Sequence, residues 1–228
     1  MSAPLPEGEE KRLEVRRLFD TISPRYDLVN RVMTFGMDVG WRRTAVGSLR
    51  LPGRSLVADL ACGTGDLCRE LQRRGYRAIG FDFSHGMLVN ARTDSPLAEA
   101  DIVRLPLADG SADGVTCGFA LRNVVSLEGF FAELGRVVRP GGRIALLDAS
   151  EPDNRVLRAG HGVYFNRIVP MIGGALSDKA AYSYLPRSMA YLPQPAEMLS
   201  MLVDAGFPDA QRRQLSGGLT QLLVGTRW

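Results

Sequence analysis

The sequence predicts an α/β fold in which a seven-stranded, mostly parallel sheet carries helices on both faces, a helical cap at the N-terminus and an antiparallel hairpin at the C-terminus. From residue 56 to about residue 148, strand-like and helix-like segments alternate, which is typical of a parallel sheet covered on both faces. Before residue 50 the apolar residues have helical spacing. Near the end, two strand-like runs flank Gly217-Gly218, so they should pair as a hairpin.

The N-terminal segments should form the cap. Residues 1–11 are rich in Pro and Glu, and we expect them to be disordered. Apolar residues then recur at near-helical spacing up to Pro24, and two more helices are expected at 26–33 and 41–49. Since all three helices precede the first strand, residues 12–50 should cover the ligand-binding end of the sheet.

The sheet and its covering helices follow in order. Strands are expected at 56–60, 77–82, 99–103, 113–119, 142–148, 209–215 and 219–226. Helices are expected at 65–74, 84–93, 126–138 and 194–204, and Arg139-Pro140-Gly141-Gly142 should stop the third of these in a tight turn. Residues 154–172 should also be helical. We expect a single domain over 12–228, in which 154–193 is an insertion on the substrate side.

The composition is ordinary for one globular domain of 228 residues. The net charge is +3 and the basic residues are almost all scattered arginines, so nucleic-acid binding, which needs a basic face, is not expected. Cys62, Cys68 and Cys117 have neither zinc-site spacing nor a disulfide framework, so we expect no metal and a reducing, cytoplasmic compartment. The first residues do not read as a signal peptide, and no apolar run reaches the roughly 18 residues that span a membrane.

The segment from Asp59 to Asp66, with the sequence Asp-Leu-Ala-Cys-Gly-Thr-Gly-Asp, is the most informative one. It follows a buried strand and precedes a helix, and a glycine turn between a strand and a helix N-terminus is a nucleotide cradle. Gly63 and Gly65 lack a Cβ atom, so the backbone can turn sharply and a ligand can approach it closely.

The residues around these glycines argue against a phosphate ligand. A dinucleotide site would have a third glycine where this chain has Cys68, and a P-loop would have Lys followed by Ser or Thr after Gly65. Asp66 instead places a carboxylate at the helix N-terminus, where a phosphate would sit. This favours a ligand with a positive centre, and S-adenosylmethionine has a sulfonium and no phosphate.

Asp82 supports a nucleoside ligand. It ends the next expected strand, roughly 20 positions after Asp59, where an acid typically binds a ribose hydroxyl pair. The alternative is a plain turn between strand and helix with an exposed aspartate.

Further segments carry a resemblance to a known family. They are Phe19-Asp20 with Tyr26-Asp27-Leu28-Val29-Asn30, Phe35-Gly36 with Trp41-Arg42-Arg43, Phe119-Ala120-Leu121-Arg122-Asn123-Val124, Arg139-Pro140-Gly141-Gly142-Arg143 and Tyr182-Ser183-Tyr184-Leu185-Pro186-Arg187-Ser188-Met189. With the glycine turn they make the chain resemble, from about Phe19 to its end, the ubiquinone/menaquinone biosynthesis C-methyltransferases, a Rossmann-like class of S-adenosylmethionine-dependent methyltransferases. The resemblance implies methylation of a prenylated quinol, with demethylmenaquinol converted to menaquinol.

The resemblance also implies the cofactor contacts. Thr64 would contact the methionine end, Asp82 the ribose, and Asp101 the adenine amine with Ile102 beside it. Gly118 stands where the better-known members have a serine, so a contact there must use the backbone or water. The full set of expected cofactor-binding residues is Asp59, Ala61, Gly63, Thr64, Gly65, Asp82, Phe83, Met87, Asp101, Ile102 and Gly118.

For catalysis the resemblance implies Arg122, Asn123 and Asp66. Methylating an aromatic carbon needs electron density on that carbon, and removal of a phenolic proton supplies it. Arginine stays protonated, so Arg122 could stabilise a phenolate but could not be the base, whereas Asp66 is the candidate to accept the proton. The alternative is that Arg122 and Asn123 only fix the loop after the fourth strand.

Substrate contacts are expected from Tyr26, Phe119, His161, Tyr164 and Tyr182. For His161 the choice between a base and a plain wall of the pocket stays open. The side chains of Met33, Phe35, Met37, Met171 and Met189 would suit an apolar entrance for an isoprenoid tail, or ordinary core packing.

The methyl acceptor is the open point. Asp148-Ala149-Ser150-Glu151-Pro152 departs from the family, which often has Glu-Phe-Ser-x-Pro there. A soluble aromatic or polyketide-like acceptor, or a cofactor-binding protein without transferase activity, therefore remain alternatives. Because a prenylated quinone lies in the bilayer, we expect a peripheral contact with the inner face of the membrane, and we leave a homodimer open.

Overall fold

The computed structural model describes residues 7–154, 157, 158, 160, 162, 164, 171, 184 and 187–228, and its centre is a seven-stranded sheet in the order β3-β2-β1-β4-β5-β7-β6. The strands are β1 (Leu56–Leu60), β2 (Arg77–Asp82), β3 (Leu97–Glu99), β4 (Ala112–Gly118), β5 (Val138–Ala149), β6 (Gln211–Leu215) and β7 (Thr220–Thr226). β1 to β5 are parallel, whereas β7 runs antiparallel to both β5 and β6. The predicted sheet and its C-terminal hairpin are confirmed.

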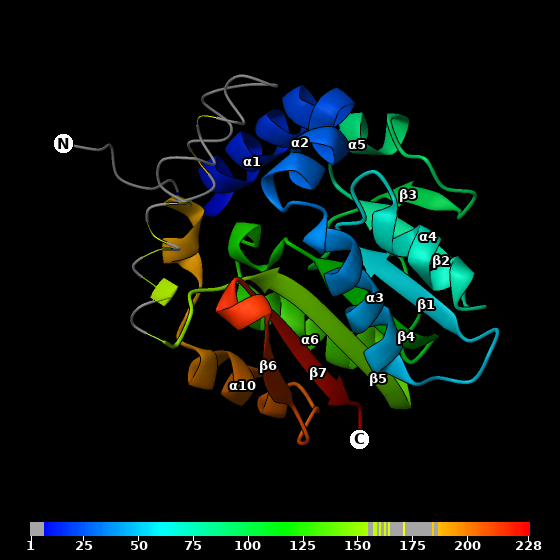
Figure 1. Cartoon of the computed structure of the whole chain (residues 1–228). Helices are drawn as coiled ribbons and strands as arrows, with labels where there is room; N and C mark the ends of the chain where they lie inside the picture. Colours follow the sequence, from blue (N-terminus) through cyan, green and yellow to red (C-terminus); the bar gives the residue numbers. More distant parts are fainter. Residues whose placement is uncertain are drawn as a thin grey trace.

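Helices cover both faces of this sheet (Figure 1). The α-helices are α1 (Gly8–Ile22), α2 (Tyr26–Met33), α3 (Met37–Leu49), α4 (Asp66–Arg73), α5 (His85–Val89), α6 (Leu127–Val137) and α10 (Pro195–Asp204). Short 3-10 turns are η1 (Ser23–Arg25), η2 (Leu121–Asn123), η4 (Met189–Tyr191) and η5 (Ser216–Gly218). One core joins α3 and α4 to the sheet, and a second joins α6 and α10 to its other face.

Several predicted boundaries were wrong, including the start of α3, which is Met37 and not residue 41. The strand expected at 99–103 is β3, Leu97–Glu99, because the Asp101 carboxylate accepts from the amide of Val103 at 3.1 Å and turns the chain. The helix expected at 84–93 ends at Val89, because the amide of Arg92 donates to the carbonyl of Thr64 at 3.0 Å. At the other end of the chain, α1 begins at Gly8, so residues 8–11 are helical where disorder was expected.

The turn expected at Arg139–Gly142 is part of β5. Ala112 pairs with Val138 and Gly114 pairs with Arg143, so the extra residues of β5 form an irregularity in the ladder. A Cβ atom on Gly142 would lie 2.8 Å from the carbonyl oxygen of Asp113, which explains the glycine. The strand thus begins four residues before the predicted start at 142.

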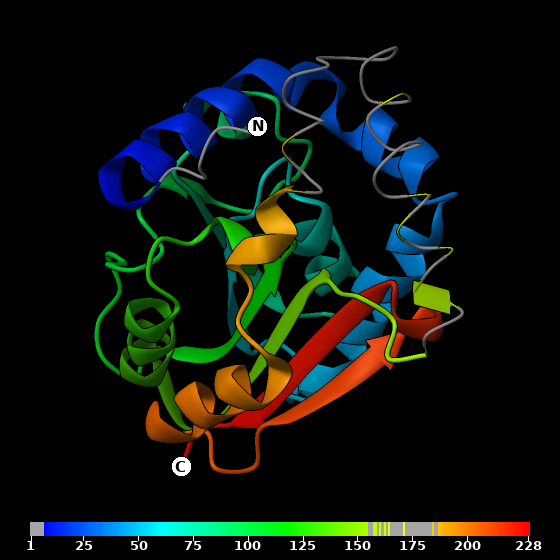
Figure 2. The same cartoon turned by 90° about the vertical axis from the view of Figure 1, so that its left-hand side faces the viewer.

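The cap lies across the carboxyl ends of the parallel strands (Figures 1 and 2). Its own core contains Ile22 from α1, Val29 and Met33 from α2, and Met87 from α5. Lys11 of α1 connects the cap to the residue after η2 and to η4. Its Nζ donates to the carbonyl of Val124 at 2.8 Å and lies 3.7 Å from the centre of the Tyr191 ring.

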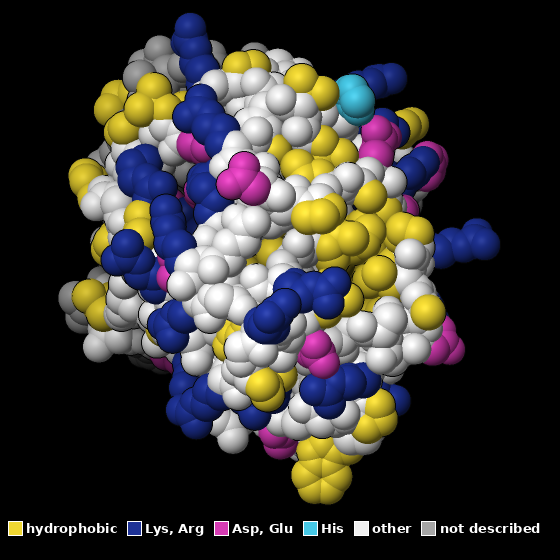
Figure 3. All heavy atoms as spheres, turned by 90° about the vertical axis from the view of Figure 1, so that its right-hand side faces the viewer, with side chains coloured by type: hydrophobic (Ala, Val, Ile, Leu, Met, Phe, Trp, Pro, Cys, Tyr) yellow, Lys and Arg dark blue, Asp and Glu magenta, His cyan; other side chains and the backbone are white. Residues whose placement is uncertain are grey.

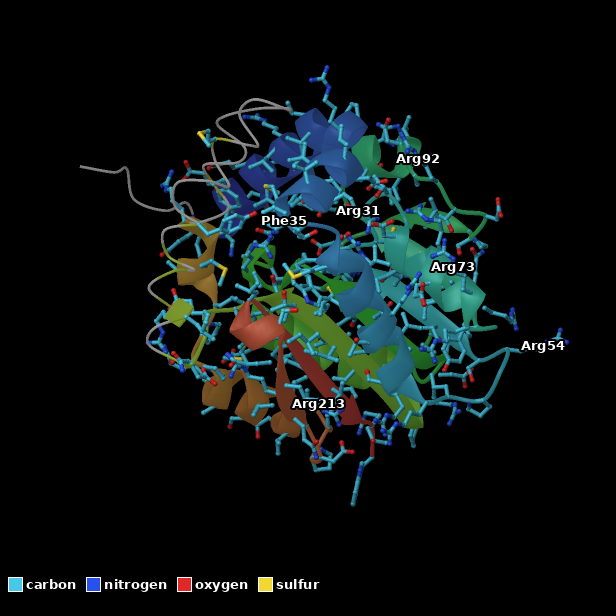
Figure 4. All side chains as sticks on the ribbon, in the orientation of Figure 1. Arg31, Phe35, Arg54, Arg73, Arg92 and Arg213 are labelled. Carbon is cyan, nitrogen blue, oxygen red and sulfur yellow. The ribbon has the colours of Figure 1, made fainter. Side chains whose placement is uncertain are left out.

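Most of the helix expected at 154–172 and of the insertion expected at 154–193 lies outside the described residues. On the face shown in Figure 3, arginines are spread out with acidic and uncharged side chains between them. Arg54, Arg73 and Arg92 point outward from the side of the molecule at the right of Figure 4. In the described part of the chain, no helix is both long and apolar enough to cross a membrane.

Candidate active site

The site lies where the strand order changes direction, at the adjacent carboxyl ends of β1 and β4. Each strand is directly followed by a residue with left-handed backbone. These residues are Ala61, with φ 51°, and Phe119, with φ 61°. Non-glycine residues adopt this conformation at a cost of about 1–3 kcal/mol, and such residues cluster at functional sites. These two turns open the crevice that a ligand could enter.

The loop after β1 is tied to the end of β2 by its main chain. The amide of Gly63 donates to Asp82 Oδ2 at 2.7 Å, and the amide of Ser84 donates to Asp82 Oδ1 at 2.9 Å. Gly65 has φ 84°, and a Cβ atom there would lie 2.6 Å from the Thr93 side chain. Burial raises the pKa of Asp82 to about 6 although its backbone hydrogen bonds act in the opposite direction.

Asp59 lies beneath this loop and is fully buried. It accepts hydrogen bonds from Thr116 Oγ1 at 2.8 Å and from Cys68 Sγ at 3.4 Å, and burial raises its pKa to about 7. Asp59 lines neither pocket, and the same holds for Thr64 and Gly65. The hydroxyl of Thr64 instead donates to Asp27 of the cap. These three predicted cofactor residues therefore support the conformation of the loop and do not line the pocket.

A pocket of about 450 Å³ lies in front of the loop and contains the other predicted cofactor residues. These are Ala61, Gly63, Asp82, Phe83, Met87, Asp101, Ile102 and Gly118. Asn123 also lines this pocket, and its Oδ1 is buried without a hydrogen-bond partner in the described part of the chain. The first turns of α1 close one side with Gly8, Glu9 and Arg12, which the sequence did not suggest.

The residues present fit S-adenosylmethionine. The Asp82 carboxylate is held by two main-chain amides and lines the pocket, so its remaining lone pairs can accept from ribose hydroxyls. Phe83 and Ile102 offer apolar surface for adenine, and the unsatisfied Asn123 Oδ1 can accept a further hydrogen bond. No group of three or more metal-type side chains is found among the described residues.

A second, larger cavity of about 640 Å³ adjoins the first. Its walls come from α1, α2, α3, η2, η5, the ends of β5 and β7, and single residues that include Tyr184. Phe19, Tyr26 and Phe119 line both cavities. These three side chains therefore mark where a cofactor in the smaller pocket and an acceptor in the larger one would meet.

Arg122 lines the larger cavity and is held by a buried ion pair. It donates to Asp148 of β5, and its Nε donates to Ser188 Oγ at 3.1 Å. Asp148 is fully buried, and its other oxygen accepts from the Arg122 amide at 3.2 Å. The position that the sequence marked as a departure from the family is thus the partner of the predicted catalytic arginine.

The predicted trio of Arg122, Asn123 and Asp66 is not assembled. Arg122 lines the larger cavity, Asn123 lines the smaller pocket, and Asp66 lines neither. The Asp66 carboxylate is bound by Arg69 and, at 3.0 Å, by Arg42. Because two arginines already occupy it, the arrangement gives no support to Asp66 as the base.

Of the predicted substrate residues, Tyr26, Phe119 and Tyr164 line the larger cavity, whereas His161 and Tyr182 lie outside the described residues. Burial raises the pKa of both Tyr26 and Tyr164. Both therefore remain protonated near neutral pH, and the Tyr164 hydroxyl donates to the Met33 carbonyl.

Sequence reasoning missed Asp38 and Arg42 as wall residues. Asp38 binds Arg42, and also accepts from Arg31 at 3.0 Å. The signal was available for Asp38 and Arg42, because an acid and an arginine four residues apart on one helix face each other. Asp148 had a signal too, as a charged residue that directly follows the apolar run 144–147.

Comparison with known proteins gives the family. The model of the ubiE/COQ5 methyltransferase family matches residues 7–227. "Ubiquinone/menaquinone biosynthesis C-methyltransferase UbiE" of Syntrophotalea carbinolica is 39% identical over 94% of this chain and 94% of its own length. "Demethylmenaquinone methyltransferase" of Deinococcus radiodurans is 37% identical over 98% and 97%.

Solved structures agree on the fold. A methyltransferase from Thermotoga maritima has a TM-score of 0.65 at 18% identity, over 93% of this chain and 99% of that one. A chain from a Haloferax volcanii complex of the Trm112 activator with a methyltransferase has a TM-score of 0.63, over 90% and 96%. The chain belongs to the ubiE/COQ5 methyltransferase family and is an S-adenosylmethionine-dependent methyltransferase, as the sequence predicted.

Proposed function

We propose that this family member methylates a ring carbon of a prenylated quinol, and that demethylmenaquinol is its acceptor. The relatives whose printed names give this activity match nearly the whole chain. The observation that carries the proposal is the larger cavity, which is walled mainly by apolar side chains and carries a few charged groups, Arg42, Asp38 and Arg122.

Apolar and polar parts of this wall fit two parts of a prenylated quinol. The apolar part includes Leu18, Ile22, Met33, Met37, Trp41 and Leu219. It suits an isoprenoid tail, while Arg122 and Tyr184 are available to the ring oxygens. A cavity of about 640 Å³ has the size of an ordinary small-molecule site.

The chemistry replaces one ring hydrogen by a methyl group. S-adenosylmethionine supplies an electrophilic methyl when bound, the new carbon–carbon bond forms as the methyl–sulfur bond breaks with its electron pair on sulfur, and the displaced ring proton passes to water. The protein's part is to align the ring carbon at the junction of the two cavities, and Phe19, Tyr26 and Phe119 are placed to do so. Arg122 lowers the cost of the phenolate that makes this carbon nucleophilic.

The mouth of the larger cavity has an apolar rim. Phe35 and Leu157 line the cavity and are 74% and 52% exposed. Leu28 and Val32, also exposed, continue the rim along the outside of α2, and Arg31 lies beside Phe35 (Figure 4). Exposed apolar side chains with arginines nearby suit the surface of an anionic bilayer, so we place the peripheral membrane contact here.

Vesicle flotation tests this contact. The protein should float with vesicles that contain anionic phospholipid, and Leu28→Ser with Phe35→Ser should reduce the floated fraction several-fold. Val203→Ser is the matched control, because Val203 is similarly exposed but lies on α10, away from this rim. Equal flotation of both variants would remove the rim from the contact.

Methyl transfer itself is tested with labelled cofactor. The protein should move the labelled methyl from S-adenosylmethionine to a short-chain demethylmenaquinol under reducing conditions, with label recovered in the organic phase. Label found only on soluble phenols would show that the acceptor is a water-soluble aromatic and not a prenylated quinol. Tight cofactor binding with no label in any acceptor would contradict the proposed reaction.

A further inference from the structure

The hydroxyl of Tyr184 is a buried polar group without a hydrogen-bond partner in the described part of the chain. The residue is only 4% exposed and lines the larger cavity. Leaving such a group unsatisfied costs about 1–3 kcal/mol, and native proteins contain few of them. A partner that arrives with the ligand removes this cost.

In other tyrosines of the chain, the hydroxyl donates a hydrogen bond to a nearby main-chain carbonyl. The Tyr164 hydroxyl, in the same cavity, donates to the Met33 carbonyl, and the Tyr76 hydroxyl, far from the cavity, donates to the Leu51 carbonyl at 3.3 Å. Tyr184 differs from both because its ring is buried while its hydroxyl has no such carbonyl. Its position therefore fits a ligand-directed role better than packing.

The charged neighbours of Tyr184 define what the ligand atom should be. Arg122 lines the same cavity, and the Tyr184 hydroxyl interacts electrostatically with Tyr191, Arg122, Glu14 and Arg187. Burial raises the pKa of Tyr184, so the hydroxyl stays protonated at neutral pH and can donate. A hydroxyl donor and a guanidinium on the wall of one cavity together favour a ligand oxygen that carries negative charge.

We propose that the Tyr184 hydroxyl donates a hydrogen bond to one ring oxygen of the acceptor, beside Arg122, and stabilises that oxygen as it becomes a phenolate. This role rests on the proposed function, since it takes a quinol as the acceptor. Two donors aimed at one developing oxyanion in a buried cavity are worth more than in water. Tyr184 then decides which of the two ring oxygens is ionised, and so which ring carbon becomes nucleophilic.

Tyr184→Phe tests the proposal, because it removes the hydroxyl and keeps the ring. We expect kcat/KM for a short-chain demethylmenaquinol to fall roughly 100-fold, as when one oxyanion donor is lost. Its pH profile should shift to higher pH, because the phenol becomes harder to ionise. S-adenosylhomocysteine affinity and the melting temperature should not fall, whereas a purely structural role would lower the melting temperature. Tyr76→Phe is the control for removing a tyrosine hydroxyl elsewhere.

Two substrate analogues sharpen the test. In the mono-methyl ethers of the same quinol, one ring oxygen or the other can no longer ionise. With the wild-type protein, the ether that blocks the oxygen facing Tyr184 should lose nearly all activity, because no phenolate can form there, whereas the other ether should keep most of it. With that other ether, Tyr184→Phe should lose about as much activity as it loses with the quinol, because the interaction is still available to be removed. Wild-type kcat/KM and an unchanged pH profile in Tyr184→Phe would overturn the role.

Equilibrium binding separates this role from the proposed function. With S-adenosylhomocysteine present, the quinol should bind the wild-type protein roughly tenfold more tightly than the variant. If the wild type binds the quinol but does not methylate it, the proposed reaction fails, and the binding difference alone decides on Tyr184. Equal binding by both proteins, or no binding by the wild type, overturns the role of Tyr184.

Discussion

The two cavities that meet at Phe119 are built in different ways. The cofactor pocket is formed by the loops that directly follow β1, β2 and β4, and its main acid, Asp82, is held by the backbone amides of Gly63 and Ser84. The substrate cavity collects side chains from six or more segments, and its arginines are held by other side chains. Arg122 depends on Asp148, which is 26 positions away.

In the smaller pocket the main chain holds the key acid in place, whereas in the larger cavity particular side chains hold the arginines in place. Backbone donors are present whatever the side chains are, so the acid of the cofactor pocket keeps its position as long as the sheet forms. A buried arginine needs one specific carboxylate, and removing that carboxylate leaves a charge that water cannot reach. We therefore expect the substrate side to be the more fragile of the two.

Breaking the Arg122–Asp148 pair should have the largest effect. Asp148→Ala leaves Arg122 buried and unpaired, and the free energy of unfolding should fall by about 3–5 kcal/mol in chemical denaturation. Asp109→Ala is the matched control, because it breaks an arginine pair whose acid is 82% exposed, and it should cost less than about 1 kcal/mol. Similar losses in the two variants would contradict the contrast between the cavities.

If Asp148→Ala does not fold, a double variant that replaces both partners of the ion pair can test the same contrast. Replacing both partners, as Arg122→Met with Asp148→Leu, removes the buried charges together and should restore most of the stability. Methyl transfer should stay strongly reduced in that double variant, because the Arg122 guanidinium no longer faces the acceptor. Recovery of activity along with stability would show that the pair serves only the fold.

Asp82→Ala should affect binding far more than folding. Of the two freed amides, that of Gly63 belongs to a residue that lines the pocket, where water can reach it, and no buried charge is left unpaired, so we expect a smaller stability loss than for Asp148→Ala. Lost charge-assisted hydrogen bonds should weaken S-adenosylhomocysteine binding by about 1.5–3 kcal/mol, roughly 10- to 150-fold, as measured by calorimetry. Unchanged affinity would remove Asp82 from the cofactor site.

The smallest effect is a dependence of cofactor affinity on pH. Asp82 is a stronger hydrogen-bond acceptor when ionised, and burial raises its pKa to about 6, so S-adenosylhomocysteine affinity should be flat above pH 7 and fall below pH 6. The fall should approach tenfold per pH unit, and calorimetry between pH 5 and 8 measures it. Asp82→Asn should abolish this slope, and a variant that keeps it would assign the titration to another group.

Stability of the ligand-free protein should show the opposite trend. Burial raises the folded-state pKa values of Asp59 and Asp82 above the 3.8 of an ordinary aspartate. Folding therefore takes up protons, and this contribution is present in full below about pH 4 and is lost as the pH rises through 6 to 7. The same acid thus favours folding when protonated and cofactor binding when ionised.

The sequence predicts most where contiguous residues fix the structure. The predicted ranges of β1 and β2 match the structure, and eight of the residues predicted to bind the cofactor line one pocket, because a glycine turn between strand and helix fixes its own geometry. The sequence did not reveal that Arg42 and Arg69 bind the Asp66 carboxylate. Contacts such as Arg42–Asp66 depend on how α3 packs on α4, which periodicity does not encode.

Because the two cavities share part of their walls, some substitutions cannot change the acceptor preference without also changing cofactor affinity. Phe19, Tyr26 and Phe119 touch both ligand spaces, so a substitution at any of them alters cofactor affinity together with acceptor choice. Met37, Trp41 and Leu219 line the larger space alone. Redesign for a bulkier or shorter acceptor, in the laboratory or by natural divergence, has its freest route through these three positions.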